Sequence, residues 1–316
     1  MRDEFVRTLT EIARQDQNVV LITGDLGFGV LTGFAREFPR QFLNIGVAEQ
    51  NMTGVAVGMA LEGRVVFTYS IGNFPTLRCL EQIRNDACYH KANVKIVSIG
   101  GGFCYGALGV SHHATEDLAI MRALPEITVV APGDTVEVAA ATRAIYRSPG
   151  TCYLRLGRGG EPRVHDSLRM FEIGKALQLF DGNDIAIMST GGILKNAYDA
   201  RQTLAERGYK VALYSVHTVK PIDRTTIQRI AETCSLVVTV EEHNILGGLG
   251  GAVAEVMAEM PRRRAVLKMI GLQDRFSCEV GDQEYLRSAY GLSVASIVET
   301  TEEAVKSVQS HEFQRR

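Results

Sequence analysis

The sequence lacks the features that mark an exported or membrane protein. Its apolar stretches fall far short of the about 20 residues that a membrane-spanning helix needs. Its first residues are acidic and helix-forming, unlike the charged and apolar lead of a signal peptide. The six cysteines form no C-x-x-C pair, and their spacing suits neither zinc nor a disulfide framework. We therefore expect a cytoplasmic protein.

The sequence is also short of charge gathered in blocks. Its 34 basic and 36 acidic residues give a net charge of −2 and are mixed along the chain. Nucleic acids and anionic membranes are bound through clusters of Lys and Arg, so we expect neither as a partner. The glycine-rich segments match neither the P-loop nor the dinucleotide fingerprint, which argues against those nucleotide-binding classes.

Short apolar runs alternate along the chain with helical patterns. Such runs are typical of parallel strands covered on both faces. One helix is expected to begin after Asp134 as its N-cap, and another to span residues 194–207 and end at Gly208. The alternation predicts doubly wound α/β layers. The expected strands are residues 19–22, 93–99, 127–130, 152–156, 185–188, 210–214 and 236–240.

The length of 316 residues and the apolar content of 46% allow two domains with large cores. Residues 157–166 are rich in Gly and Pro and have no periodicity, which makes them the best linker candidate. We therefore predict an α/β protein of two doubly wound domains, residues 1–160 and residues 167–316.

Glu49 stands at the entry to a helical segment of small and apolar residues, 53–61, that reads as buried. Burial favours the neutral form of a carboxyl group, and a neutral carboxyl can donate a hydrogen bond or transfer a proton near pH 7. A simpler interpretation stays open, since a carboxylate at a helix N-terminus gains roughly 0.3–1 kcal/mol from the dipole. Gly54 and Gly58 would let another backbone approach, in a second subunit or in ordinary packing.

Two turns carry further candidates. A strand is expected to end near Tyr69 and a helix to begin near Pro75, which places Phe74 where open α/β sheets bind ligands. An aromatic ring there could stack on a planar heterocycle or belong to the core. Glycines 100–102 indicate a backbone that passes close to another group. Residues 247–251 fit either an anion-binding nest or tight helix packing.

Taken together, these segments resemble the C-terminal half of transketolase-like thiamine-diphosphate enzymes. The resemblance covers essentially the whole chain, in order, and its combination of motifs is highly specific. It implies a mainly parallel-sheet pyrimidine-binding domain followed by a smaller C-terminal-type α/β domain. The matching segments are residues 44–52, 67–84, 109–118, 131–134, 153–158, 189–192 and 240–248.

The resemblance also implies roles for individual residues. The Glu49 carboxyl would hydrogen-bond N1′ of the aminopyrimidine ring, so that the 4′ nitrogen becomes the base that activates the thiazolium ring for attack on a ketose. Phe74 would stack on the pyrimidine with help from Ile71. Asp25 would neighbour the cofactor, although a capped turn is the alternative for this residue.

The substrate side follows from the same resemblance. His112 would face the substrate, and Arg2 and Arg158 would hold the terminal phosphate of a sugar, although Arg2 could also be a surface arginine. The pair of histidines at 112 and 113 lacks a third metal ligand nearby, so we expect no metal there. Leu108 stands where ordinary transketolases carry an Asp, which implies a non-standard sugar such as a deoxy or branched one.

The resemblance finally implies a partner. The motif Gly-Asp-Gly with a downstream Asn, which holds Mg²⁺ and the diphosphate in full-length relatives, has no match in this sequence. We therefore expect a split transketolase whose N-terminal subunit supplies the magnesium site, assembled as α₂β₂. The alternatives are the β subunit of a 2-oxo-acid dehydrogenase and a non-catalytic interaction subunit. Arg78 and residues 111–113 favour a transketolase, and Glu49 and Phe74 argue against a non-catalytic role.

Overall fold

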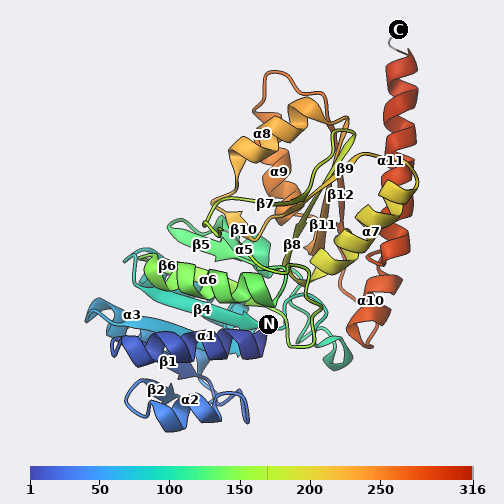
Figure 1. Ribbon diagram of the computed structural model, residues 1–316. Coiled ribbons are helices and arrows are strands. Elements are labelled where there is room, and N and C mark those ends of the chain that lie inside the picture. The colour runs from blue at the N-terminus through green and yellow to red at the C-terminus, as the bar shows by residue number, and fades with distance from the viewer. Residues whose placement is uncertain (169, 315–316) are drawn as a thin grey trace.

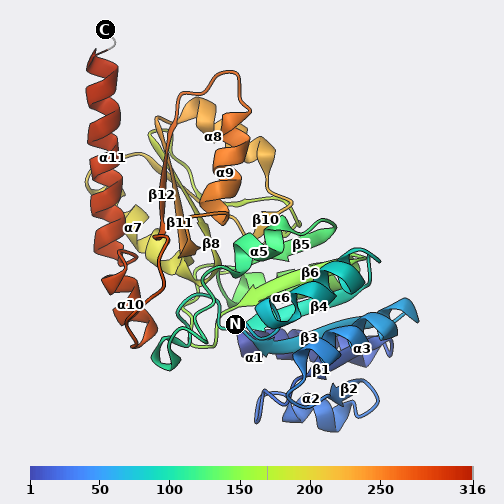
Figure 2. The same cartoon turned by 180° about the vertical axis from the view of Figure 1, so that it is seen from behind.

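The chain folds into two α/β units, each built as a sheet between two layers of helices (Figures 1 and 2). The computed structural model describes residues 1–168 and 170–314, and the side chains as far as residue 310. Among the described residues, no helix is both long enough and apolar enough to cross a bilayer. The predicted α/β class with two doubly wound units is confirmed.

The first sheet has seven strands in the order β10-β5-β6-β4-β3-β1-β2, and all but β10 run parallel. Helices α1, α2 and α6 cover one face, and α3, α5 and η2 cover the other. The strands are β1 (Val19–Thr23), β2 (Phe42–Asn44), β3 (Val65–Ile71), β4 (Val94–Ile99), β5 (Ile127–Val130), β6 (Thr151–Leu156) and β10 (Thr218–Lys220). The helical elements are α1 (Arg2–Gln15), α2 (Thr32–Glu37), α3 (Glu49–Leu61), η1 (Leu77–Cys79), α4 (Leu80–Gln82), the π-helical η2 (Ile83–Cys88), η3 (Gly106–Leu108), α5 (Asp117–Ala123) and α6 (Thr135–Arg147).

The second sheet has five strands in the order β12-β11-β8-β9-β7, and only β7 runs antiparallel to its neighbour. Helices α7 and α11 cover one face, and α8 and α9 cover the other. The strands are β7 (Leu177–Phe180), β8 (Ile185–Thr190), β9 (Val211–Ser215), β11 (Leu236–Asn244) and β12 (Val266–Leu272). The helical elements are η4 (Gly191–Ile193), α7 (Leu194–Glu206), α8 (Arg224–Thr233), α9 (Leu249–Ala258), α10 (Gln283–Ala289) and α11 (Val294–Gln314).

Most sequence expectations for local structure are confirmed. All seven expected apolar runs are strands. Asp134 caps α6, since its Oδ1 accepts hydrogen bonds from the backbone N–H groups of residues 136 and 137 at 3.0 and 2.9 Å. Helix α7 ends at Glu206, and Gly208 follows with a φ of 92°, a conformation that glycine adopts without strain.

Two local expectations are wrong. No helix begins near Pro75, because residues 72–76 form a tight turn in which the Phe74 N–H binds the Ile71 oxygen and the Thr76 hydroxyl binds the Gly72 oxygen. The first helical turn begins at Leu77 instead. Residues 53–61 are buried on one face only, and Gly54 and Gly58 on the other face are exposed.

The segment between the units is irregular from residue 157 to residue 176. The Asp134 carboxylate also holds this segment, since its Oδ2 accepts the backbone N–H groups of Val164 and His165 at 2.9 and 2.8 Å. Strand β10 follows β9 along the chain but pairs with β5 of the first sheet. The division into residues 1–160 and 167–316 stays a prediction, and one short strand crosses it.

Candidate active site

The candidate site lies at the carboxyl edge of the first sheet. Strands β1, β3 and β4 are parallel, so the segments that follow them emerge at the same edge. Glu49 lies there as the first residue of α3, with 2% of its side chain surface exposed. Gly24, just after β1, leaves room for it: a Cβ atom at Gly24 would lie 3.4 Å from Glu49 Cγ. The expected buried carboxyl is therefore present.

Glu49 has an ionic partner. Arg78 Nη1 lies 2.7 Å from Glu49 Oε2, and the Arg78 guanidinium lies 4.8 Å from the centroid of the Phe74 ring. The guanidinium stabilises the negative charge of the buried carboxylate. It also covers a face of the ring on which a heterocycle was expected to stack.

This pairing was not predicted from the sequence, where Arg78 served only as a family marker. The available signal was the spacing of four residues between Phe74 and Arg78 at the start of a helical segment, which places two side chains next to each other.

His112 joins the same cluster. Its ring meets the Phe74 ring edge-on with centroids 5.2 Å apart, and its Nδ1 lies 3.0 Å from the Ser111 hydroxyl oxygen. Burial, followed by the neighbouring charge of His113, lowers the pKa of His112 below its ordinary value of 6.5. At neutral pH the imidazole is therefore uncharged and able to exchange hydrogen bonds with a substrate.

His113 points elsewhere. Its Nε2 lies 3.0 Å from the Gly106 oxygen, and its ring packs against Phe103 at 5.1 Å. The two adjacent histidines thus serve different surroundings. No cluster of three metal-ligating side chains occurs in residues 1–168 and 170–310, where side chains are described.

Arg2 and Arg158 lie around Tyr105. The Arg158 guanidinium is 5.4 Å from the Tyr105 ring centroid. Burial raises the pKa of Tyr105, and the charges of Arg158 and Arg2 oppose that rise. The Tyr105 ring also lies 6.1 Å from His112. The two arginines expected at a sugar phosphate therefore face one aromatic side chain next to the expected substrate histidine.

Sequence reasoning missed Tyr105. Its ring lies against Gly100, where an added Cβ atom would approach Tyr105 Cδ2 to 2.2 Å. Glycine at position 100 is therefore required by the position of this ring. The triple glycine was the available signal, because it announced a close approach without naming the group that approaches.

Asp25 and Ile71 lie at the ends of their strands. Asp25 has a φ of 59°, and its N–H and carboxylate both bind the side-chain amide of Asn44, at 3.0 and 2.9 Å. The structure thus contains the capped turn that was the alternative for Asp25. Ile71 ends β3 and accepts the Phe74 N–H on its backbone oxygen.

The glycine segments approach protein side chains. A Cβ atom at Gly101 would lie 2.6 Å from Arg155 Nε, and one at Gly102 would lie 2.6 Å from Glu242 Oε1. Residues 247–251 form a nest for the Glu241 carboxylate, which accepts the backbone N–H groups of residues 249 and 250 at 2.7 and 2.8 Å. Both segments are explained by contacts within the chain.

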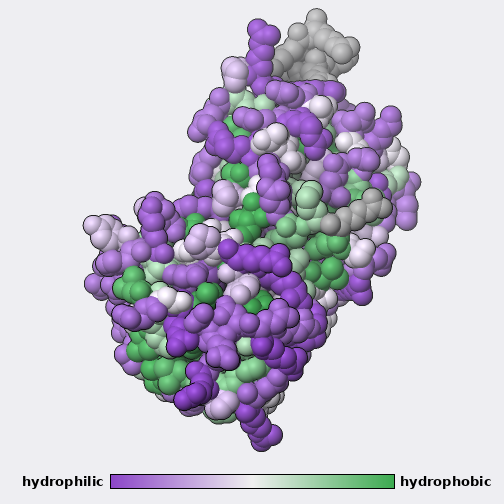
Figure 3. Space-filling view, turned by 60° about the vertical axis from the view of Figure 1, so that its left-hand side comes forward, coloured by the Kyte–Doolittle hydropathy of each residue, from purple (hydrophilic) through white to green (hydrophobic). Residues whose placement is uncertain are grey.

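A cleft of about 410 Å³ opens beside the cluster, lined by Phe74, Arg78 and Ser111 and by Phe276 and Ser277 from the segment after β12. Apolar patches interrupt the polar surface of the molecule (Figure 3). Several large apolar side chains on segments around this edge are exposed. They are Phe28, Val47, Leu77, Leu108, Val110, Phe276 and Val280.

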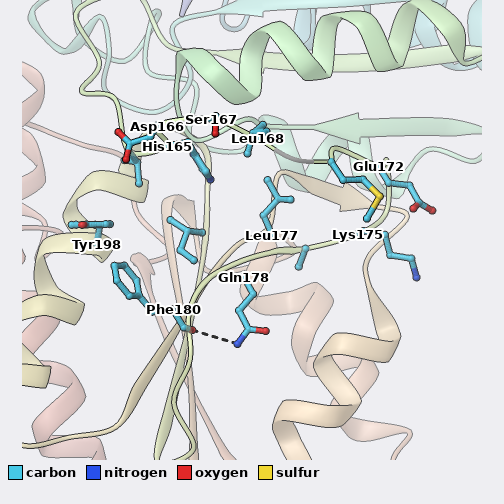
Figure 4. Close-up of a pocket in the computed structure, with 14 residues that line it drawn as sticks. His165, Asp166, Ser167, Leu168, Glu172, Lys175, Leu177, Gln178, Phe180 and Tyr198 are labelled. Carbon is cyan, nitrogen blue, oxygen red and sulfur yellow. Dashed lines mark hydrogen bonds between the residues drawn. The ribbon is translucent and has the colours of Figure 1, made fainter.

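A second cleft, of about 590 Å³, lies between the irregular segment and β7 (Figure 4). His165, Lys175 and Tyr198 are among its lining residues, and none of the predicted site residues lines it. This cleft is therefore separate from the candidate active site.

We expect Arg78→Met to lower the free energy of unfolding, because it leaves the buried Glu49 carboxylate without its ionic partner. Charged hydrogen bonds of this kind contribute about 1–3 kcal/mol, and the exposure of half the Arg78 side chain places the loss at about 1–2 kcal/mol. Urea denaturation would measure it. Arg14→Met, which removes an exposed pair with Glu37, is the matched control and should change the midpoint little. Equal effects of both substitutions would contradict the stabilising role of Arg78.

The pKa of His112 is expected below 6.5 in the folded chain. A titration followed by NMR on the ring protons, assigned through His112→Asn, would measure it. Because the folded value lies below the unfolded one, protonation favours the unfolded chain, so stability decreases as the pH falls below about 6.5. A midpoint at or above 6.5 would show that the ring is not desolvated.

Two family descriptions match the chain. Residues 1–161 match the transketolase pyrimidine binding domain, and residues 174–297 match the transketolase C-terminal domain. One of the two subunits of the apulose-4-phosphate transketolase of Phocaeicola vulgatus is 36% identical over 307 residues, covering 96% of this chain and 97% of the relative. The 6-deoxy-6-sulfo-D-fructose transketolase subunit SqwH of Clostridium sp. is 35% identical over 310 residues, covering 97% and 94%.

A solved structure agrees in fold and extent. The one described as a split gene transketolase, inactive beta4 tetramer, matches with a TM-score of 0.86 and 35% identity, covering 96% of this chain and 97% of the other. These matches run nearly end to end and include proteins that are separate subunits. The chain belongs to the transketolase family, in the form of the C-terminal subunit of a split transketolase.

Proposed function

We propose that the chain works with an N-terminal subunit as a thiamine-diphosphate-dependent transketolase that transfers a two-carbon ketol unit between sugars, at least one of them non-standard. The observation that carries the proposal is the buried Glu49 carboxylate beside Phe74 and His112, in a chain whose relatives are transketolase subunits.

The residues present fit one end of the cofactor. A carboxylate with 2% exposure suits a ring nitrogen that shares a proton, and Phe74 suits the face of a heterocycle. Asp25 and Ile71, at the ends of β1 and β3, would flank it. No magnesium-ligating cluster occurs among the described side chains, so the diphosphate and Mg²⁺ are assigned to the partner subunit.

Thiamine diphosphate, when bound, supplies the nucleophilic carbon and the electron sink for ketol transfer. Glu49 would hold a proton at N1′ of the aminopyrimidine ring. For this, Arg78 has to leave the face of Phe74 or share the carboxylate from one side. His112, uncharged at neutral pH because its pKa is lowered, would exchange hydrogen bonds with a substrate oxygen.

The substrate is proposed to carry a terminal anion. The names of the two relatives describe a sugar phosphate and a sulfo sugar, and phosphate and sulfonate are both bound by guanidinium groups. Arg2 and Arg158, which meet around Tyr105, would bind this group. The exposed Leu108 and Val110 would favour a sugar with fewer hydroxyl groups near His112, since apolar side chains cannot hydrogen-bond them.

The partner is proposed to cover the edge that carries Glu49. Exposed apolar side chains there, such as Phe28 and Val47, are typical of an interface. Two chains of each kind, α₂β₂, would give two sites. The neighbouring structure described as an inactive tetramer of β chains is consistent with a subunit that associates but needs another chain for activity.

We expect Glu49→Gln to lower turnover of the reconstituted complex at least about 10²-fold, the range of a positioned acid–base group. The assay would use fructose 6-phosphate and 6-deoxy-6-sulfofructose as ketol donors, with glyceraldehyde 3-phosphate as acceptor. Glu62→Gln is the matched control, because Glu62 follows the last residue of the same helix and is exposed. It should leave turnover unchanged.

Two results would count against the proposal. Unchanged turnover in Glu49→Gln would leave this residue with only a structural role. Decarboxylation of a 2-oxo acid by the complex, without ketol transfer from any sugar, would favour the 2-oxo-acid dehydrogenase alternative.

A further inference from the structure

The loop that carries His112 is closed at its neck. Gly102 and Ala114 form an antiparallel bridge, with N–H···O distances of 2.7 and 3.0 Å in the two directions. Residues 103–113 therefore leave the first unit and return as one closed excursion, with His112 close to its return strand. Whatever fixes this excursion also fixes the position of His112.

Glu242 of the second unit fixes the neck from outside. Its Oε1 accepts the backbone N–H of Phe103 at 2.6 Å, and a Cβ atom at Gly102 would lie 2.6 Å from the same oxygen. The loop backbone thus passes directly over the carboxylate. The bond joins residues 139 positions apart in the chain, so it ties the two units together at this point.

The carboxylate is itself held by donors. Arg287 donates from Nε and Nη2 to Oε2 at 2.8 and 2.6 Å, and Gln283 Nε2 reaches both oxygens at 2.9 and 3.0 Å. The Glu242 and Arg287 side chains are 4% and 6% exposed. A buried carboxylate surrounded only by donors cannot turn away without leaving several of them unpaired. Glu242 is therefore a rigid anchor.

The loop side chain next to this bond belongs to the core of the second unit. Phe103 is 1% exposed and packs with Leu286, Leu292 and other residues of that core. Its ring meets His113 edge-on at 5.1 Å, and His113 is bonded directly to His112. A displacement of Phe103 is thus transmitted to the histidine pair through one ring contact and one peptide bond.

We propose that Glu242 is a positioning residue, which sets the place of His112 by holding the Phe103 backbone against the second unit. The chemical importance of His112 rests on the function proposed above, whereas the mechanical link does not. The C-terminal-type unit would then determine part of the geometry of a site that it does not otherwise enter through a catalytic group.

The test compares two neighbouring glutamates in the purified chain. Glu242→Gln keeps the size of the side chain but turns one acceptor oxygen into a donor that faces other donors. Glu241→Gln is the matched control: Glu241 is also fully buried and also accepts two backbone N–H groups, but on α9 and not on the loop. Readouts are hydrogen exchange of residues 103–113 and the NMR signals of the His112 ring.

We expect Glu242→Gln to raise the exchange rate of the Phe103 amide at least about tenfold and to shift the His112 ring signals, while Glu241→Gln changes neither. In the reconstituted complex, with the donor sugar that supports turnover, kcat/KM should fall about 10- to 100-fold, as for a small misplacement of a reacting group, while affinity for thiamine diphosphate stays unchanged. If Glu242→Gln is insoluble, Gly102→Ala pushes the loop off the same carboxylate and should give the same signature.

Unmoved His112 signals in both variants that disturb the neck would overturn the positioning role. Equal effects of Glu241→Gln and Glu242→Gln would also overturn it, because they would indicate general loosening of the second unit. Shifted signals together with unchanged turnover would uphold the mechanical link and contradict the proposed function of His112, so the two ideas fail separately.

Discussion

The burial of one negative charge, that of Glu49, constrains the arrangement around it. An ionised carboxylate taken out of water needs a partner or a proton, and in this chain Arg78 at 2.7 Å is that partner. Arg78 reaches the carboxylate only because the segment after β3 turns sharply through residues 72–76 before becoming helical. The same turn places Phe74 between Arg78 and His112.

The sequence was informative wherever a residue pattern acts locally. Apolar runs marked the strands, and Asp134 and Gly208 marked helix ends, because burial on two faces and backbone capping depend on adjacent residues. The convergence of Glu49, Phe74 and His112 on one sheet edge also followed, since carboxyl ends of parallel strands share an edge. Pro75 misled because a proline suits a turn as well as a first helical residue.

Contacts between distant segments were beyond the same reasoning. The pairing of Glu49 with Arg78, the ring of Tyr105 over Gly100 and the crossing of β10 to the first sheet depend on packing of whole elements. The triple glycine predicted a close approach but could not show that the approaching groups are Tyr105, Arg155 and Glu242. The roles of Asp25, Ile71, Arg2 and Arg158 stay predictions, although their positions suit them.

The two neighbouring glutamates of β11 show how one strand can serve two purposes. Successive side chains of a strand point to opposite faces, so Glu241 binds the start of α9 while Glu242 binds the loop of the other unit. Both carboxylates are buried, and each is satisfied by several donors. Burial raises the pKa of Glu241 to about 7, whereas Glu242 faces the guanidinium of Arg287. A capping carboxyl group can lose its charge and keep its place, but an anchor held by a cation cannot. The loop that carries His112 is therefore fastened by the stronger electrostatic arrangement of the two.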